Sequence, residues 1–335
     1  MNMRILVTGS TGFLGNNVAR QLLKGGHKVR ALVRRSHDPR SLEGLDLERA
    51  TGDVCDLKSI EAAMHDVSAV IHCAGCVKIG WSELDTHQQV NVEGTRNVAS
   101  AAHQRQIRLI HVSSINALGM ATKTRTADES WADPGIVPCP YVVTKQQAER
   151  VIDELVADGL DAAVVNPGFM LGPWDWKPSS GQMVLQVARR WTPISPSGGV
   201  SVCDVRDVAA AAITAIEKAG VGQRYVLGGE NMPYFQLWKL IAEVTGSKGP
   251  WISARPLQRI IAGAYGDIWG RFTQTESEIN SAAVKLSSQR HFFSSHRAQQ
   301  ELDYHSRPAR ESIQDTWKWF SEHGFLHPAP ATPST

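Results

Sequence analysis

Residues 5–15 join an apolar run to a glycine-rich turn almost at the start of the chain, with the sequence ILVTGSTGFLG. The run is typical of a buried strand, and helical periodicity follows as far as Lys24. Gly9 can make a tight turn, Gly12 has no side chain to obstruct a phosphate, and Gly15 lets the helix lie close to the strand. The N–H groups of that helix would then face the phosphates of a dinucleotide. The first gap is one residue longer than in the usual fingerprint, so a purely structural turn is the alternative.

Tyr141 and Lys145 lie four residues apart in a segment with helical periodicity, so they share one face of the expected helix. A free tyrosine has a pKa of about 10, and an adjacent ammonium together with a cationic nicotinamide would lower that value. Ser113 and Ser114 follow another apolar run, where a hydroxyl at the strand end can bind a substrate oxygen. These groups predict a tyrosine acid/base. An ordinary helix with a half-buried tyrosine and a solvated lysine is the alternative.

Six further segments match one family pattern: Gly52-Asp53-Val54, His72-Cys73-Ala74-Gly75, Asn91-Val92-Glu93-Gly94-Thr95, Asn166-Pro167-Gly168, Val205-Arg206-Asp207-Val208-Ala209 and Tyr225-Val226-Leu227-Gly228-Gly229. With the two motifs above, they make the chain resemble the extended short-chain dehydrogenases/reductases, also called the NAD-dependent epimerase/dehydratase family. The resemblance extends from Arg4 to about Phe320. It points to the dihydroflavonol-4-reductase-like and hopanoid-associated sugar-epimerase-like branch of that family.

The resemblance implies a role for each matching residue. The catalytic residues would be Ser114, Tyr141 and Lys145. The cofactor contacts would be Gly9, Thr11, Gly12, Phe13, Leu14, Gly15, Asp53, Val54, Cys73, Ala74, Gly75, Asn91, Ser113, Tyr141, Lys145 and Pro167. In this pattern Asp53 and Val54 hold the adenine, and the turn from Cys73 to Gly75 lies on the side of the adenosine ribose and pyrophosphate. Ser113 and Pro167 lie beside the nicotinamide.

The end of the second expected strand bears on the choice of cofactor. It carries Arg34 and Arg35 and no acidic residue at the position that would bind a ribose 2′-hydroxyl. An arginine there can pair with a 2′-phosphate, whereas NAD-specific sites use a carboxylate. We therefore expect Arg34 to contact the cofactor and NADP to be preferred over NAD. In the alternative, the arginines are solvated, or Arg34 stacks on the adenine of either cofactor.

Apolar runs alternate with helical patterns through the first half of the chain. Strands are expected at Arg4–Thr8, Lys28–Val33, Leu47–Thr51, Ala69–Cys73, Leu109–Ser113 and Ala162–Asn166, and helices near Gly12–Lys24, Ser59–His65, Leu84–His103 and Tyr141–Asp158. Repeated strand–helix–strand units predict an α/β fold with a doubly wound parallel sheet, the Rossmann fold. Ligands of such sheets bind beyond the carboxyl ends of the strands, where the predicted site residues fall.

The chain is expected to divide near Pro167. Residues 1–167 would form the dinucleotide-binding Rossmann domain, and residues 168–327 mainly a smaller, interleaved substrate-binding subdomain. Short strands around Ser201–Cys203 and Tyr225–Leu227, within the segment near 200–228, are expected to return to the Rossmann sheet. Residues 328–335 are Pro, Ala, Ser and Thr, a composition that predicts a disordered tail.

Substrate specificity is expected to lie in Trp174–Arg190 and Arg255–Thr275, where the family pattern is weakest. Lys177 and Arg189 could pair with a diphosphate, or they could be solvated surface charges. The segment Arg255–Phe272 has apolar residues at amphipathic helix spacing. This predicts a lid helix that covers the core, with a partner helix or a membrane-surface contact as the alternative.

Composition excludes several classes of function. A net charge of +2 with no long basic block gives no sign of nucleic-acid binding. No uninterrupted apolar run is long enough to span a bilayer, and a core strand begins almost at residue 1, where a signal peptide would stand. We therefore expect a cytoplasmic protein that acts on a small molecule.

Five cysteines, an odd number scattered through 335 residues, are typical of reduced thiols. Cys73 and Cys76 have the spacing of a redox or metal-binding pair. No second pair of Cys or His stands at a metal-ligand spacing, however, and the segment coincides with the family's cofactor turn. We expect incidental packing there and no metal site.

The residues above are compatible with two reactions. In the first, NADPH delivers a hydride to a ketone or aldehyde while Tyr141 protonates the oxygen. In the second, tightly held NAD takes a hydride from a sugar hydroxyl and returns it, which gives epimerisation or starts a dehydration. A non-catalytic dinucleotide sensor or scaffold ranks lower, because Tyr141 and Lys145 are both present. The resemblance also implies a homodimer that packs Leu84–His103 and Tyr141–Asp158 as a four-helix bundle.

Overall fold

The main element of the computed structural model, which describes residues 2–122, 125–130, 137–273 and 275–326, is a seven-stranded sheet. All neighbouring strands are parallel, in the order β10-β6-β5-β4-β1-β2-β3. The strands are β1 (Arg4–Thr8), β2 (Lys28–Val33), β3 (Glu48–Thr51), β4 (Ala69–His72), β5 (Arg108–Val112), β6 (Ala162–Pro167) and β10 (Arg224–Leu227). The expected doubly wound α/β fold is confirmed.

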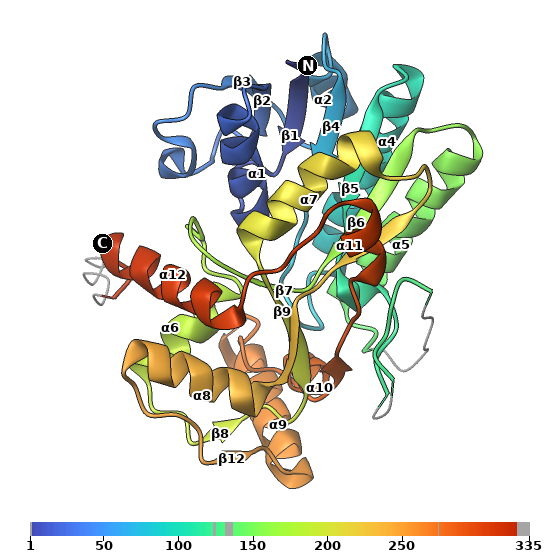
Figure 1. Ribbon diagram of the computed structural model, residues 1–335. Helices are drawn as coiled ribbons and strands as arrows, with labels where there is room; N and C mark the ends of the chain where they lie inside the picture. The colour runs from blue at the N-terminus through green and yellow to red at the C-terminus, as the bar shows by residue number, and fades with distance from the viewer. Residues whose placement is uncertain (1, 123–124, 131–136, 274, 327–335) are drawn as a thin grey trace, which may run out of the picture.

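Helices cover both faces of this sheet (Figure 1). One face packs against α1 (Phe13–Lys24) and α7 (Val205–Lys218), and the other against α2 (Leu57–Ala63), α4 (Gly94–Gln104) and α5 (Pro140–Ala157). Helix α3 (Leu84–His87) and a π-helical turn, Gln88–Glu93, lead directly into α4. Two 3₁₀ turns lie at Pro39–Leu42 and Ile115–Ala117. Because both faces are covered, central strands such as β1 are almost wholly apolar and buried.

A second, mixed sheet stands beside the first. It contains β7 (Phe169–Leu171), β9 (Gly199–Asp204), β11 (Glu230–Pro233) and β13 (Arg290–His291), and a two-stranded ribbon pairs β8 (Ile194–Ser195) with β12 (Ile252–Ser253). Helices α6 (Gly181–Arg189), α8 (Tyr234–Thr245) and α12 (Ala309–Glu322) pack around it. All of these elements follow β6 in the sequence, but the division of the chain near residue 167 stays a prediction.

One of the two later strands does not return to the main sheet as expected. Strand β10 pairs with β6, whereas Ser201–Cys203 lies within β9, in the second sheet. The reason is that the chain leaves the main sheet immediately after β6. Strand β7 then pairs with β9 in parallel. Gly168 makes the crossing possible, because a Cβ atom there would lie 2.5 Å from the carbonyl oxygen of Ser201.

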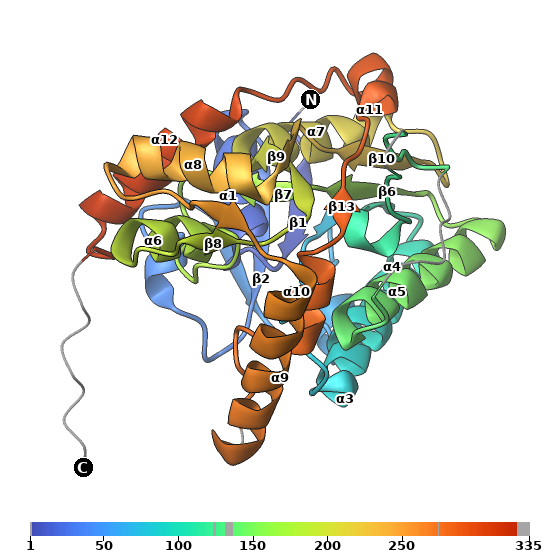
Figure 2. The ribbon, with the colours of Figure 1, turned by 90° about the horizontal axis from the view of Figure 1, so that it is seen from below.

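The remaining helices are α9 (Pro256–Thr273), α10 (Ser281–Leu286) and α11 (His296–Glu301). Figure 2 shows α9 extending away from the body of the molecule. The expectation that its large apolar side chains cover the core is wrong: its buried residues are Gly263 and Gly266, and the large side chains are exposed. Within the described ranges, no helix combines the length and the apolar character needed to cross a membrane. The predicted tail, 328–335, lies outside the described residues.

Candidate functional site

The glycine turn between β1 and α1 forms a cradle in which backbone segments lie in close contact. Gly9 has a φ of +68°, and a Cβ atom there would lie 2.6 Å from the backbone nitrogen of Ala74. A Cβ atom on Gly15 would collide with the carbonyl oxygen of Gly9. Helix α1 begins after Gly12 without a side-chain cap and has no acidic residue in its first turn. These features fit the phosphates of a dinucleotide. Thr11, Phe13 and Leu14 complete the turn.

The loop after β3, where the adenine was expected, lies beside the cradle. The Asp53 carboxylate accepts a hydrogen bond from the Cys55 N–H at 3.0 Å, which fixes the loop. Val54 packs so closely on α4 that a Cβ atom on Gly94 would lie 2.8 Å from its Cγ2 atom. Burial raises the pKa of the Cys55 thiol to about 11, and the guanidinium of Arg34 opposes that rise. Arg34 is exposed directly after β2 and is near enough to this loop to affect the Cys55 thiol.

Ser114, Tyr141 and Lys145 are brought together beyond the carboxyl end of β5. All three side chains are buried. Ser114 begins the 3₁₀ turn and accepts a hydrogen bond from the Asn116 N–H at 3.2 Å. One turn of α5 after Tyr141, the Lys145 ammonium donates to the carbonyl oxygen of Val112 at 3.0 Å. The structure thus gathers the three predicted catalytic residues from two segments of the chain.

The pKa of Tyr141 shifts in the opposite direction to the one expected from its neighbour Lys145. Burial raises the Tyr141 pKa, and the side chains of Ser114 and Asn116 oppose that rise. The ammonium is held by the Val112 carbonyl instead. Burial also lowers the pKa of Lys145 to about 8, although the Glu149 carboxylate opposes this. At neutral pH the chain's own groups therefore keep Tyr141 as a phenol, which can donate a proton.

Asn91 joins the turn after β4 to α5. Its amide accepts from the Cys76 N–H at 2.7 Å and donates at 3.0 Å both to the Cys76 carbonyl oxygen and to the Thr144 hydroxyl. A Cβ atom on Gly75 would lie 3.2 Å from the Asn91 amide oxygen and 3.3 Å from the Lys145 ammonium. Asn91 therefore positions the turn from Cys73 to Gly75, and its predicted contact with the cofactor stays a prediction.

Cys73 and Cys76 are both free thiols. Burial raises the pKa of Cys73 to about 12, so this thiol is not reactive. The Cys76 sulfur lies 3.4 Å from a ring nitrogen of His87. Across the part of the chain that the structure describes, no three His, Cys, Asp or Glu side chains are placed to hold a metal ion.

Ser113 directly follows β5 and Pro167 ends the neighbouring β6, at the same edge of the sheet. The Ser113 hydroxyl is buried and has no hydrogen-bond partner among the described residues. Because a buried hydroxyl without a partner is costly, this atom suits a contact with a bound ligand. Both residues thus lie where the nicotinamide side of the cradle was expected.

Two features of the site were missed in the sequence. Asn116 lies close enough to Tyr141 to affect its pKa. The sequence indicated Asn116 only by its position two residues after Ser114, in the same turn. The second feature is a buried chain of hydrogen bonds in which the His72 ring joins Thr8 at 2.6 Å to Thr95 at 3.1 Å. This chain ties β4 to β1 and α4, and nothing in the local pattern indicated it.

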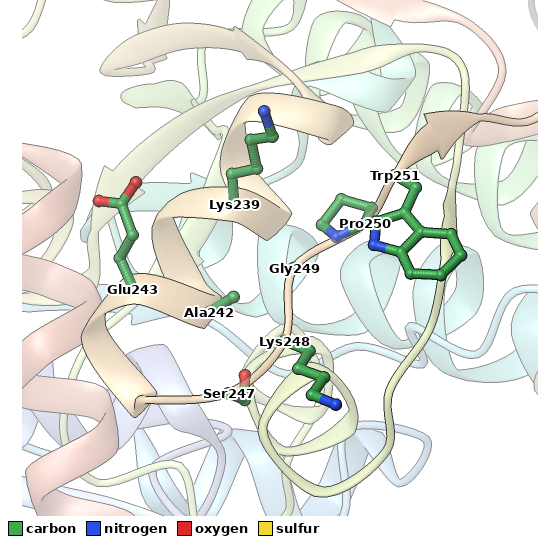
Figure 3. Close-up of a pocket in the computed structure, with 8 residues that line it drawn as sticks. All are labelled: Lys239, Ala242, Glu243, Ser247, Lys248, Gly249, Pro250 and Trp251. Atoms are coloured by element: carbon green, nitrogen blue, oxygen red, sulfur yellow. The ribbon is translucent and has the colours of Figure 1, made fainter.

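The predicted substrate-side charges do not join this cluster. Lys177 and Arg189 are exposed, and Lys177 lies near Asp38, whose low pKa is due mainly to Arg40. A separate surface hollow (Figure 3) is lined by Lys239, Ala242, Glu243, Ser247, Lys248, Gly249, Pro250 and Trp251. It shares no residue with the glycine cradle or with the Ser114 cluster. We therefore assign the chemistry to the cradle and not to the hollow.

Comparison with known proteins agrees with this geometry. The sequence model of the NAD dependent epimerase/dehydratase family matches residues 5–228. The chain is 33% identical to the sterol demethylase protein B of Methylococcus capsulatus, over 97% of this chain and 100% of that protein. It is 31% identical to a Synechocystis sp. protein that carries the name dihydroflavonol 4-reductase, over 96% and 95% of the two chains.

Among solved structures, the crystal structure of gox2253 is similar along the whole chain. Its TM-score is 0.85 at 33% identity, with 97% of this chain and 100% of that chain covered. The match to the family spans the glycine turn, the Ser114 cluster and β10. The chain therefore belongs to the NAD-dependent epimerase/dehydratase family, the extended short-chain dehydrogenases/reductases, and is an enzyme of the oxidoreductase or epimerase type.

Proposed function

We propose that this enzyme uses NADPH to reduce a carbonyl group on an apolar small molecule. The observation that carries the proposal is the buried cluster of Ser114, Tyr141 and Lys145 beside the glycine cradle, with Tyr141 kept as a phenol. A phenol is the protonation state that reduction needs, because the new alkoxide must receive a proton. The relatives named for sterol and dihydroflavonol chemistry support an apolar carbonyl or alcohol as substrate.

The residues of the chain divide the work of this reaction. The bound nicotinamide supplies the hydride. The Ser114 hydroxyl holds the carbonyl oxygen by a hydrogen bond, and Tyr141 gives its phenolic proton to that oxygen. The Lys145 ammonium, held by the Val112 carbonyl, stabilises the negative charge that forms on Tyr141. Because all three side chains are buried, these interactions act with little screening by water.

A screen of ketones and aldehydes with NADPH tests the proposal. The expected result is stoichiometric oxidation of NADPH with formation of an alcohol, on steroid-like or flavonoid-like ketones more than on free sugars.

The second candidate is epimerisation or dehydration of a nucleotide sugar by tightly bound NAD, which the family itself favours. Recovery of NAD from the purified protein, with turnover of a nucleotide sugar and no net oxidation of cofactor, would replace the reductase proposal. Retained function in the Tyr141→Phe variant would favour a non-catalytic sensor or scaffold.

Replacing Arg34 by Ala is expected to remove the preference for NADPH. The wild type should bind NADPH at least about tenfold more tightly than NADH, a difference of about 1.4 kcal/mol. Arg34 is the exposed cation beside the Asp53 loop, so its loss should weaken NADPH binding and leave NADH binding nearly unchanged. Equilibrium titration of both cofactors measures this. Arg35→Ala is the matched control, and equal effects of the two substitutions would remove the proposed role of Arg34.

We also propose a homodimer that packs the helices α4 and α5 of two copies as a four-helix bundle, in the cytoplasm. Within one chain, α4 and α5 already lie side by side on the sheet, so they present one continuous surface (Figure 1). Sedimentation at micromolar concentration should give twice the mass of the chain. A monodisperse monomer would refute the dimer.

A further inference from the structure

Helix α9 turns glycines toward the protein and large apolar side chains toward the solvent, the reverse of a helix that packs on a protein core. Gly263 and Gly266 face inward: a Cβ atom on Gly263 would lie 3.0 Å from the Cα atom of Ser281, and one on Gly266 would collide with the carbonyl oxygen of Ile279. The opposite side carries seven large apolar or aromatic side chains, each more than half exposed. They are Leu257, Ile260, Ile261, Tyr265, Ile268, Trp269 and Phe272, here called the α9 strip. At 3.6 residues per turn all seven fall on one side of the helix.

Further exposed apolar residues lie in the segment just before α9. Strand β12 carries Ile252 and directly follows Trp251, which is 71% exposed. Trp191 packs edge-on against Trp251 with ring centroids 4.6 Å apart. Seven large apolar side chains on one helix face form a grouped apolar surface, which marks an interaction site, whereas scattered exposed residues would need no explanation.

Charges around the strip indicate what it contacts. Arg255 precedes the helix and Arg271 lies in its last turn, both exposed, and no described carboxylate pairs with either. The one acidic residue of α9, Asp267, accepts a hydrogen bond from the Ser281 N–H at 2.9 Å. The hollow beside Trp251 adds Lys239 and Lys248 (Figure 3). Its carboxylate, Glu243, is paired with Arg310 at 2.6 Å.

We propose that the α9 strip binds the surface of an anionic lipid bilayer. An apolar face with Trp and Tyr, flanked by free arginines, is the pattern of a helix that lies in the membrane interface. A second copy of this chain fits less well, because a two-fold contact joins identical surfaces and so brings the flanking arginines of both copies to one interface. The inward glycines explain why the helix stays attached: they let α9 lie against α10 and leave the large side chains for the lipid.

The position of α9 links this surface to the catalytic cluster. Helix α10 packs with Cys139, Tyr141 and Val142 in one apolar cluster. The Glu276 carboxylate, between α9 and α10, accepts from the Trp81 N–H at 2.6 Å. Binding of α9 would therefore hold the Tyr141 end of the site close to the lipid. That this position delivers an apolar substrate rests on the proposed function, whereas the binding to lipid does not.

Flotation of the full chain with vesicles tests the docking, with no substrate or activity needed. The wild type should float with vesicles of phosphatidylcholine and phosphatidylglycerol and bind more weakly to phosphatidylcholine alone. Ile261→Gln with Phe272→Gln should lower binding at least about tenfold, because two inserted side chains are lost. Leu57→Gln with Val221→Gln is the matched control: both residues are exposed apolar side chains away from α9, and binding should not change.

Thermal melting checks that each variant is folded, and Ile260→Gln with Tyr265→Gln provides a second pair on the same strip if the first does not fold. No flotation of the wild type, or equal flotation of the α9 and control variants, would overturn the proposal. So would a loss of self-association in the α9 variants without any binding of vesicles by the wild type, because the occupant would then be a second copy. If the wild type floats with the vesicles but shows no reductase activity, only the proposed function is refuted.

Discussion

Tyr141→Phe is expected to lower kcat by about 10²- to 10⁴-fold, the usual contribution of a positioned general acid. Phenylalanine keeps the ring in its apolar surroundings and removes only the hydroxyl that faces Ser114 and Asn116. The affinity for NADPH should stay within about threefold of wild type, since the phenol is only one of many cofactor contacts and such a change is worth about 0.7 kcal/mol. Loss of NADPH absorbance in the presence of the best ketone from the screen measures kcat, and titration measures affinity.

A matched control separates chemistry from stability. Tyr234 on α8 is 7% exposed, the same fraction as Tyr141, and burial raises its pKa too. It packs in the apolar core of the second sheet. Tyr234→Phe should therefore reproduce any cost of removing a buried hydroxyl while leaving kcat unchanged. If both variants lose activity to the same degree, the effect of Tyr141→Phe is structural and Tyr141 is not the acid.

The Rossmann half could be predicted closely from the sequence because its signals are local. Strands β1 and β2 have the predicted bounds. Helix α5 begins and ends one residue earlier than expected. Each of these elements is flanked by its own turn or helix start. The predicted site residues come together for the same reason, since the carboxyl ends of parallel strands meet at one edge of the sheet, and their roles stay predictions.

The second half was harder because its strands find distant partners. Strand β9 pairs with β7, β11 and β13, and β13 lies far along the chain. Nothing within the six residues of β9 decides between that sheet and the main one. Likewise, the periodicity of α9 defined an apolar face but not the side it would turn to the protein. That was decided by glycines, whose lack of a side chain permits close contact with α10.

The direction of the Tyr141 pKa shift could not be predicted from spacing either. Four residues of helix place Lys145 near Tyr141, but the carbonyl of Val112, on another strand, decides where the ammonium points. Burial then dominates for the phenol, as it does for the lysine. In the chain without its cofactor, Tyr141 is therefore a phenol.

Gly9→Ala is expected to destabilise the fold and abolish measurable cofactor binding, with affinity falling at least about 100-fold, or about 2.7 kcal/mol. Two costs add in this variant. A φ of +68° costs alanine about 1 kcal/mol, and the new methyl carbon, 2.6 Å from the Ala74 nitrogen and 2.7 Å from the Cys73 carbonyl carbon, adds about 1–3 kcal/mol of overpacking. Relief of that collision must separate β1 from the turn after β4, which are the two walls of the cradle.

Gly26→Ala isolates the cost of a positive φ for alanine. Gly26 also has a positive φ, +81°, but a Cβ atom there meets no atom within 4 Å. This variant should lose only about 1 kcal/mol of unfolding free energy and bind NADPH as the wild type does. Denaturant unfolding and cofactor titration on the two variants give the comparison. The strand–turn contact between Gly9 and Ala74 would be refuted as the basis of the cradle if the two alanines proved equally mild, because backbone strain alone would then account for both.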